Sequence, residues 1–224
     1  MMADDAGAER EAAGPNARPR ALIIDDHPVI IAGCRVALAH AGFGDIASAA
    51  SGEEGCEAYA REAPDVVVVD INLPGISGFE TARKILEADP EARILFFSMN
   101  EDPIFAARAI ASGAKGYISK GEDPLDFIAA VKTVANGGVF LKAELARRLS
   151  FYEKDSALNP LQTLSDRDLE ILRHLCNGKS VAEIAEILGM SSKTAANAAT
   201  AIKNKLGARS IIDMVRIASQ HRLI

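Results

Sequence analysis

Polar side chains follow several short apolar runs in the first half of the chain. Asp25 and Asp26 follow ALII, Asp70 follows VVVV, Ser98 ends RILFFS, and Lys120 comes just after GYIS. Three carboxylates that meet at one place repel one another unless a cation lies among them, and a hard divalent ion such as Mg²⁺ prefers oxygen ligands. One carboxylate can then act as a nucleophile toward a phosphoryl group, while the metal ion and a lysine neutralise the phosphoryl oxygens.

This chemistry requires the apolar runs to be strands of one parallel sheet. Strands are predicted at 21–26, 45–50, 65–70, 93–98 and 116–119, and helices near 28–41, 52–62, 78–88, 101–112 and 122–136. Strands that alternate with helices of this length indicate a parallel sheet covered on both faces, and ligands of such sheets bind at the carboxyl ends of the strands. We therefore predict an α/β fold with a doubly wound, five-stranded, flavodoxin-like parallel sheet.

Each polar residue also has an ordinary structural interpretation. Asp26 would be the N-cap of a helix entered through Pro28, and Asp70 would close a strand before a turn. Ser98 and Lys120 would be exposed loop residues. Their joint position at the ends of the predicted strands favours a functional site.

Residues 161–224 are helical in pattern throughout. A serine precedes each of four short helical stretches, as an N-cap residue does: Ser165, Ser180, Ser191 and Ser210. Ser180 and Glu183 also fit a capping box, in which each side chain bonds a backbone N–H of the other residue. Tight turns marked by glycine separate the helices, so we predict a small all-α domain of four helices that contains a helix-turn-helix.

The predicted organisation has four parts. Residues 1–20 are acidic and Ala-rich and lack the apolar core of a secretory signal, so they are expected to be a disordered leader. Residues 21–138 form the α/β domain. Residues 139–160 are a linker with one helix around 143–151, and residues 161–224 are the helical domain.

Composition restricts the location and the partners. No apolar run approaches the roughly 18 residues that span a bilayer, so no membrane partner is expected. Cys34, Cys56 and Cys176 are odd in number and far apart, which predicts reduced thiols and a cytoplasmic protein.

Residues 1–159 carry 16 Lys and Arg against 25 Asp and Glu, a balance of −9, whereas residues 160–224 carry 9 against 6, a balance of +3. A basic tail domain behind an acidic one points to nucleic acid.

Residues 21–136 resemble the receiver domain of bacterial two-component response regulators. The resemblance lies in IIDDHP, PDVVVVDINLPGISG, FFSM and GAKGYISKG, which occur in the family's order and spacing. It implies that Asp70 accepts a phosphoryl group from a histidine kinase. It further implies that Asp26, Asp70 and the backbone carbonyl of Asn72 bind Mg²⁺, with Asp25 acting through water.

The resemblance also assigns the residues that respond to the phosphoryl group. Lys120 is its salt-bridge partner, and Ser98 and Tyr117 are the switch pair, in which Tyr117 turns inward when Ser98 moves toward the phosphoryl group. A phosphatase of the haloacid dehalogenase type also uses a strand-end Asp as nucleophile, but it needs a second Asp two residues later as general acid. Asn72 stands at that position, so we expect no enzymatic turnover.

Residues 163–219 resemble the LuxR-type helix-turn-helix, and a receiver joined to this module is typical of the NarL/FixJ family. The matching stretches are TLSDRDLEILRHLCNGKSVAEIAEILGMSSKT and IKNKLGARSIIDMVRIA. The resemblance implies that residues 191–206 are a recognition helix for the major groove of DNA. It implies that the unphosphorylated domain packs on the receiver and hides this helix. Phosphorylation would release it and let the last helix, 210–219, form a homodimer.

The sequence departs from the family where DNA would be contacted. The family usually has Lys at position 196 and His at 198, whereas this chain has Ala196 and Ala198. Alanine offers only a methyl contact to a base, whereas Asn197 can pair with an adenine edge. The remaining candidates for DNA contact, in which the lysines would hold phosphates, are Lys193, Thr194, Asn197, Thr200, Lys203 and Lys205.

Two functions therefore stay open. One is a phosphorylation-controlled transcription regulator that binds DNA. The other is a phosphorylation-switched protein-interaction regulator whose Ala-rich helix packs against a partner and has lost sequence-specific DNA binding. Ala is also the best helix former, so its abundance does not decide between them.

Overall fold

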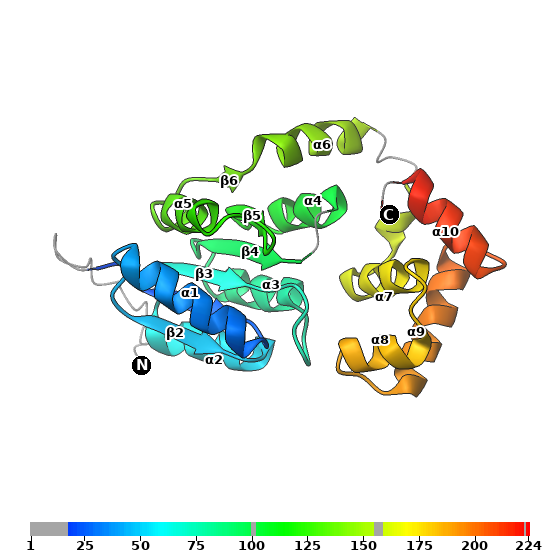
Figure 1. Cartoon of the computed structure of the whole chain (residues 1–224), viewed down its shortest axis with the longest axis horizontal. Helices are drawn as coiled ribbons and strands as arrows, with labels where there is room; N and C mark the ends of the chain where they lie inside the picture. The colour runs from blue at the N-terminus through cyan, green and yellow to red at the C-terminus, as the bar shows by residue number, and fades with distance from the viewer. Residues whose placement is uncertain (1–17, 100–101, 155–158, 222) are drawn as a thin grey trace, which may run out of the picture.

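The computed structural model describes residues 18–99, 102–154, 159–221 and 223–224. Its first part is a parallel sheet flanked by helices, and its last part is helical (Figure 1). The predicted leader lies mostly outside the described residues. The strands of the sheet are β1 (Ala21–Ile24), β2 (Ile46–Ala49), β3 (Val66–Val69), β4 (Ile94–Ser98), β5 (Gly116–Ser119) and β6 (Phe140–Leu141).

The strand order is β2-β1-β3-β4-β5-β6, and every pairing is parallel. This confirms the predicted doubly wound sheet, and the first five strands lie within two residues of their predicted bounds. The chain direction across the sheet reverses at β1, which lies between β2 and β3. The carboxyl ends of β1 and β3 are therefore neighbours at the point where such sheets bind ligands.

The prediction of five strands was wrong by one. Phe140 and Leu141 form β6, which pairs with Gly116 and Tyr117 of β5. A strand of two residues has no period that could be recognised in the sequence, and it follows a pair of glycines within a segment that reads as a linker. β6 places the start of this linker on the sheet itself.

Helices cover both faces of the sheet (Figure 1). Cys34, Leu38 and Phe127, from α1 and α5, pack in one cluster on one face, while residues of α2, α3 and α4 pack on the other. The VVVV strand is at most 1% exposed at any residue, as expected of a strand buried on both sides. The helices are α1 (Pro28–His40), α2 (Gly52–Glu62), α3 (Gly78–Ala88), α4 (Pro103–Ala111) and α5 (Pro124–Ala135).

The remaining elements follow β6. The linker forms α6 (Ala143–Lys154), which packs on α4, and a 3₁₀ turn, η2 (Pro160–Thr163), begins the helical domain. Four helices follow: α7 (Asp166–Cys176), α8 (Val181–Ile187), α9 (Ser192–Lys205) and α10 (Ile211–Gln220). Each of the four predicted serine caps accepts a hydrogen bond from a backbone N–H of the first turn, and Ser180 with Glu183 forms the predicted capping box. Such a cap contributes typically about 1 kcal/mol.

Two further expectations can be compared with the described residues. The three cysteines are free thiols; Cys34 is buried, whereas Cys56 and Cys176 are only half-buried. None of the helices in the described part of the chain has the length and apolar character needed to cross a membrane.

Gly78, at the start of α3, allows this helix to approach the end of β3 closely. A Cβ added to Gly78 would lie 1.9 Å from the carbonyl oxygen of Asp70 and 2.9 Å from the Cα of Ile71. Both are backbone atoms that cannot rotate away. The position of Asp70 relative to α3 therefore depends on the missing side chain.

We predict opposite effects of Gly→Ala at two helical positions. Gly78→Ala should lower the free energy of unfolding by about 1–3 kcal/mol, because the new methyl group displaces the backbone of Asp70. Gly33, in the exposed part of α1, has no atom within 4 Å of an added Cβ, so Gly33→Ala should raise stability by about 0.5–1 kcal/mol. Urea unfolding of both variants measures the difference, and equal effects would contradict it.

Candidate functional site

Asp25, Asp70 and Lys120 meet at the carboxyl ends of the strands. The two carboxylates are buried, at 1% and 4% exposure. The Lys120 Nζ lies 2.6 Å from Asp25 Oδ2 and 2.8 Å from Asp70 Oδ2. The three residues come just after β1, β3 and β5, so the sheet topology brings them together. The three residues that the sequence predicted to share a site therefore lie together, and their chemical roles stay a prediction.

Burial and the ion pairs set the protonation states of the group. Burial raises the pKa of Asp70 to about 6, although Lys120 opposes the shift. Burial also disfavours the Lys120 ammonium, but Asp70 and Asp25 outweigh this effect and raise its pKa. At neutral pH Asp70 is therefore ionised, and a positive charge lies beside it.

The donor set beside Asp70 fits a hard divalent cation. Ligand atoms of Asp25, Asp26, His27 and Asp70 all lie within 4.8 Å of one another. Three of the four residues offer carboxylate oxygens, which Mg²⁺ prefers. The backbone N–H of Asn72 donates to the Asp70 carboxylate, which places the loop that carries Asn72 against the site.

Sequence reasoning missed His27. Its Nδ1 lies 2.8 Å from Asp26 Oδ1 and 3.2 Å from Asp25 Oδ1, and its backbone N–H donates to Asp25 Oδ1 at 2.9 Å. The imidazole therefore helps to hold the two carboxylates in place. In the sequence, the signal for His27 was its position directly after Asp25 and Asp26.

Ser98 and Tyr117 are adjacent and buried, at 0% and 1% exposure. Their hydroxyl groups are hydrogen-bonded to each other, and burial raises the pKa of Tyr117. Tyr117 belongs to β5, where it pairs with Phe96 of β4, two residues before Ser98. The structure thus brings Ser98 and Tyr117 together, with Tyr117 already buried before any phosphoryl group is present. Their role as a switch pair stays a prediction.

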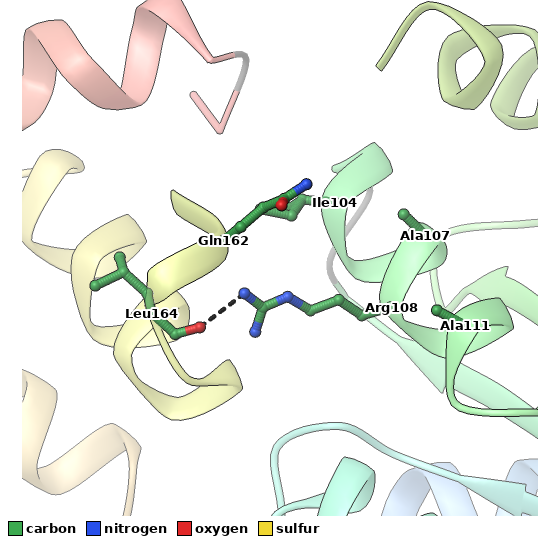
Figure 2. Close-up of a pocket in the computed structure, with 6 residues that line it drawn as sticks. All are labelled: Ile104, Ala107, Arg108, Ala111, Gln162 and Leu164. Atoms are coloured by element: carbon green, nitrogen blue, oxygen red, sulfur yellow. Dashed lines mark hydrogen bonds between the residues drawn. The ribbon is translucent and has the colours of Figure 1, made fainter. Parts of the chain in front are cut away.

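The helical domain contacts the α/β domain through α4, a contact that sequence reasoning missed. Arg108 of α4 forms an ion pair with Asp166, and its Nη2 donates to the carbonyl oxygens of Leu161 at 3.2 Å and Leu164 at 2.7 Å. Figure 2 shows the guanidinium reaching across to Leu164. Beside it lies a cavity of about 360 Å³ with a mainly apolar wall from Ile104, Ala107, Ala111 and Leu164.

A second ion pair joins the two domains near the start of α4. Arg173 Nε of α7 lies 3.1 Å from Asp102 Oδ2, and the two side chains are 29% and 14% exposed. On the same helix Glu170 is 2% exposed. Burial raises its pKa to about 8, Arg167 opposes this shift, and the charge of Asp70 adds to it. The electrostatic field of the acidic site therefore extends to α7.

The predicted DNA-contacting residues lie on α9, and their surroundings differ. Lys193, Thr194, Asn197 and Thr200 are exposed. Lys205 Nζ lies 2.6 Å from Asp168 of α7, and the Thr200 hydroxyl donates to the carbonyl of Ala196 at 3.0 Å. Lys203 is half-buried. Two of the candidates thus already have partners within the domain.

The expectation that the receiver hides the recognition helix was wrong for this structure. The exposed side chains of Lys193, Asn197 and their neighbours leave the outer face of α9 open. Instead, α7 and the turn at Gly189 face the α/β domain (Figure 1). The physical reason is that α7 makes the ionic contacts with the α/β domain and η2 adds a carbonyl hydrogen bond. Both elements lie on the other side of the helical domain from the outer face of α9 (Figure 1).

Asp70→Asn should stabilise the fold at pH 7 by on the order of 2 kcal/mol, since it removes a buried carboxylate that ionises with difficulty. The pKa of Asp70 is higher in the folded than in the unfolded chain, so the folded chain holds the proton longer. The contribution of Asp70 to stability should therefore fall as the pH rises from about 4 to about 6, and then level off. Glu170, whose pKa is raised to about 8, continues the fall above pH 6 in the parent protein and in Asp70→Asn alike. Urea unfolding from about pH 4 to about pH 6 should show the slope in the parent protein and a reduced slope in Asp70→Asn. An unchanged slope would contradict the assignment; exposed Asp45→Asn is the control.

Comparisons with known proteins agree with this geometry. Residues 21–132 match the response regulator receiver domain, and residues 162–218 match the bacterial regulatory proteins of the luxR family. The chain is 30% identical over 205 residues to the response regulator UvrY of Escherichia coli K12, covering 90% of this chain and 94% of that protein. It is 34% identical over 203 residues to the methanol utilization control regulatory protein MoxX of Paracoccus denitrificans, covering 89% and 91%.

Solved structures show the same architecture. A LuxR-family two-component response regulator from Aurantimonas sp. SI85-9A1 is 32% identical with a TM-score of 0.59, covering 62% of this chain and all of that one. RcsB from Salmonella enterica serovar Typhimurium bound to a promoter is 22% identical with a TM-score of 0.61, covering 91% and 99%, and shows the shared fold. The chain therefore belongs to the NarL/FixJ family of response regulators, with a receiver domain followed by a LuxR-type DNA-binding domain.

Proposed function

We propose that Asp70 accepts a phosphoryl group from a histidine kinase and that this event controls transcription through α9. The observation that carries the proposal is the group of Asp25, Asp70 and Lys120 at the carboxyl ends of three strands, with the Lys120 Nζ 2.8 Å from the Asp70 carboxylate. The division into a receiver at 21–138, a linker at 139–160 and a DNA-binding domain at 161–224 is part of this proposal.

The reaction uses the ionised carboxylate of Asp70. One of its oxygens bonds to phosphorus while the bond between phosphorus and the kinase imidazole nitrogen breaks, and that nitrogen keeps the electron pair. Mg²⁺ held by Asp26, Asp70 and the backbone carbonyl of Asn72, with Asp25 acting through water, would neutralise the phosphoryl oxygens. Lys120 pairs with one of these oxygens.

The switch pair then responds to the new group. Ser98 gives up its hydrogen bond with Tyr117 and donates to a phosphoryl oxygen instead. This moves the end of β4. Asn72 stands where a phosphatase would have its general acid, which disfavours rapid hydrolysis. The acyl phosphate on Asp70 therefore lasts long enough to act as a signal.

The output is DNA binding by a cytoplasmic protein that forms a homodimer when phosphorylated. Lys193 at the start of α9 holds a phosphate, and exposed Asn197 reads a base edge. The relatives are named as regulators, and RcsB is described as bound to a promoter. One observation favours the alternative of a protein-binding helix: Lys205 and Thr200 are occupied within the domain.

Asp70→Asn should abolish phosphoryl labelling by a small-molecule phosphodonor with Mg²⁺, because the attacking oxygen is gone. The matched control is Asp45→Asn, an exposed acid just before β2, which should label as the parent protein does. Labelling of Asp70→Asn at normal yield would contradict the assignment of the site.

Activated protein should enrich genomic fragments that share a two-fold motif, with beryllofluoride standing in for the phosphoryl group. Asn197→Ala should then lose about 1–3 kcal/mol at one base position, whereas Lys193→Gln should weaken binding to all sequences and lower the salt slope by about one. Binding is measured at several salt concentrations with competitor DNA.

No enrichment in either state, from a protein whose oligomeric state still responds to beryllofluoride, would reject DNA as the target. The output would then be sought among proteins.

A further inference from the structure

Asp102 is the N-cap residue of α4, but its side chain does not cap the helix. Its backbone is extended, Pro103 follows as the first helical residue, and no capping hydrogen bond is formed by the carboxylate. An Asp at this position usually accepts a hydrogen bond from the first turn of its own helix. Here the carboxylate instead contacts Arg173 of the DNA-binding domain at 3.1 Å. Asp102 therefore joins the two domains and does not cap its own helix.

The charges of this ion pair act on one of the switch residues. The charge of Asp102 raises the pKa of Tyr117 and that of Arg173 lowers it. Along the chain, only three residues separate Ser98, at the end of β4, from Asp102. We therefore expect a displacement of Ser98 toward a phosphoryl group to change the position of Asp102.

The Arg108 contact lacks this connection. Its partners are Asp166 and the carbonyls of Leu161 and Leu164, all in the segment from η2 to the start of α7. Arg108 lies in the second turn of α4, six residues after Asp102. It holds the domains together through groups at the beginning of the helical domain.

We propose that the ion pair between Asp102 and Arg173 is the phosphorylation-sensitive part of the domain contact, while Arg108 is a clamp that does not respond to phosphorylation. This inference rests on the proposed function, because it takes phosphorylation of Asp70 as the event that moves Ser98. Since the outer face of α9 is already open, release of the pair changes the orientation of the DNA-binding domain rather than uncovering its recognition helix.

The test measures how far the two domains separate in the full chain, by small-angle X-ray scattering with and without beryllofluoride. The ratio of molecules with separated domains to molecules with joined domains is an equilibrium constant, which is measured with and without beryllofluoride. The coupling factor is the constant with beryllofluoride divided by the constant without it. Asp102→Asn and Arg173→Gln remove the sensitive pair, Arg108→Gln is the matched control, and Arg173→Lys keeps the charge.

In the parent protein the factor should be at least about tenfold. Asp102→Asn and Arg173→Gln should raise the separated fraction without beryllofluoride and reduce the factor to below about threefold. Arg108→Gln should raise the separated fraction in both states and keep the factor within about twofold of the parent value. Arg173→Lys should retain most of the factor.

The inference is overturned if Arg108→Gln lowers the factor as much as Arg173→Gln, or if Arg173→Gln leaves it unchanged. Phosphoryl labelling of Asp70 in the same variants keeps the two proposals apart. Normal labelling with an unchanged factor rejects the role of the ion pair alone, whereas no labelling in the parent protein rejects the proposed function as well.

Discussion

The ammonium group of Lys120 between Asp25 and Asp70 is the interaction on which the site depends. Two carboxylates at 1% and 4% exposure repel each other and lose hydration, and a buried charge persists only when it is paired. Lys120 supplies the counter-charge and follows β5. This strand is not adjacent to β1 or β3, the strands that the two carboxylates follow. The arrangement therefore requires β1, β3, β4 and β5 to lie in this order, and it would be lost if one strand changed its place or register.

The same constraint explains several features around the site. Gly78 lets α3 begin against the carbonyl of Asp70, so the loop after β3 is held from both sides. His27 holds the exposed edge of the acidic group. Ser98 ends β4, the strand between β3 and β5, so its movement toward Asp70 is a movement of the end of that strand. The helix that follows, α4, contacts the sheet, α6 and the DNA-binding domain. A movement caused by a change of charge at Asp70 can therefore reach the rest of the chain through α4.

Local patterns predicted most of this structure. Continuous apolar runs located the first five strands, and N-cap serines located the four last helices, because both signals depend on nearby residues. β6 was missed since two residues carry no period. The ion pairs of Arg108 and of Arg173 were missed because residues so far apart in sequence leave no spacing to read. The hidden recognition helix was expected from a resemblance alone, and no local pattern of this chain could have tested it.

β6 and α6 anchor the linker on the receiver almost to its end. Leu141 is paired in the sheet, α6 packs on α4, and the connection from α6 at Lys154 to η2 at Pro160 is short. A released DNA-binding domain therefore stays within a small volume around the receiver, at an effective concentration in the millimolar range typical of short tethers. Two ion pairs and a few carbonyl contacts suffice to hold the domain under these conditions. The same surfaces on two separate molecules meet at a much lower concentration. The contact therefore forms between the two domains of one chain rather than between two chains.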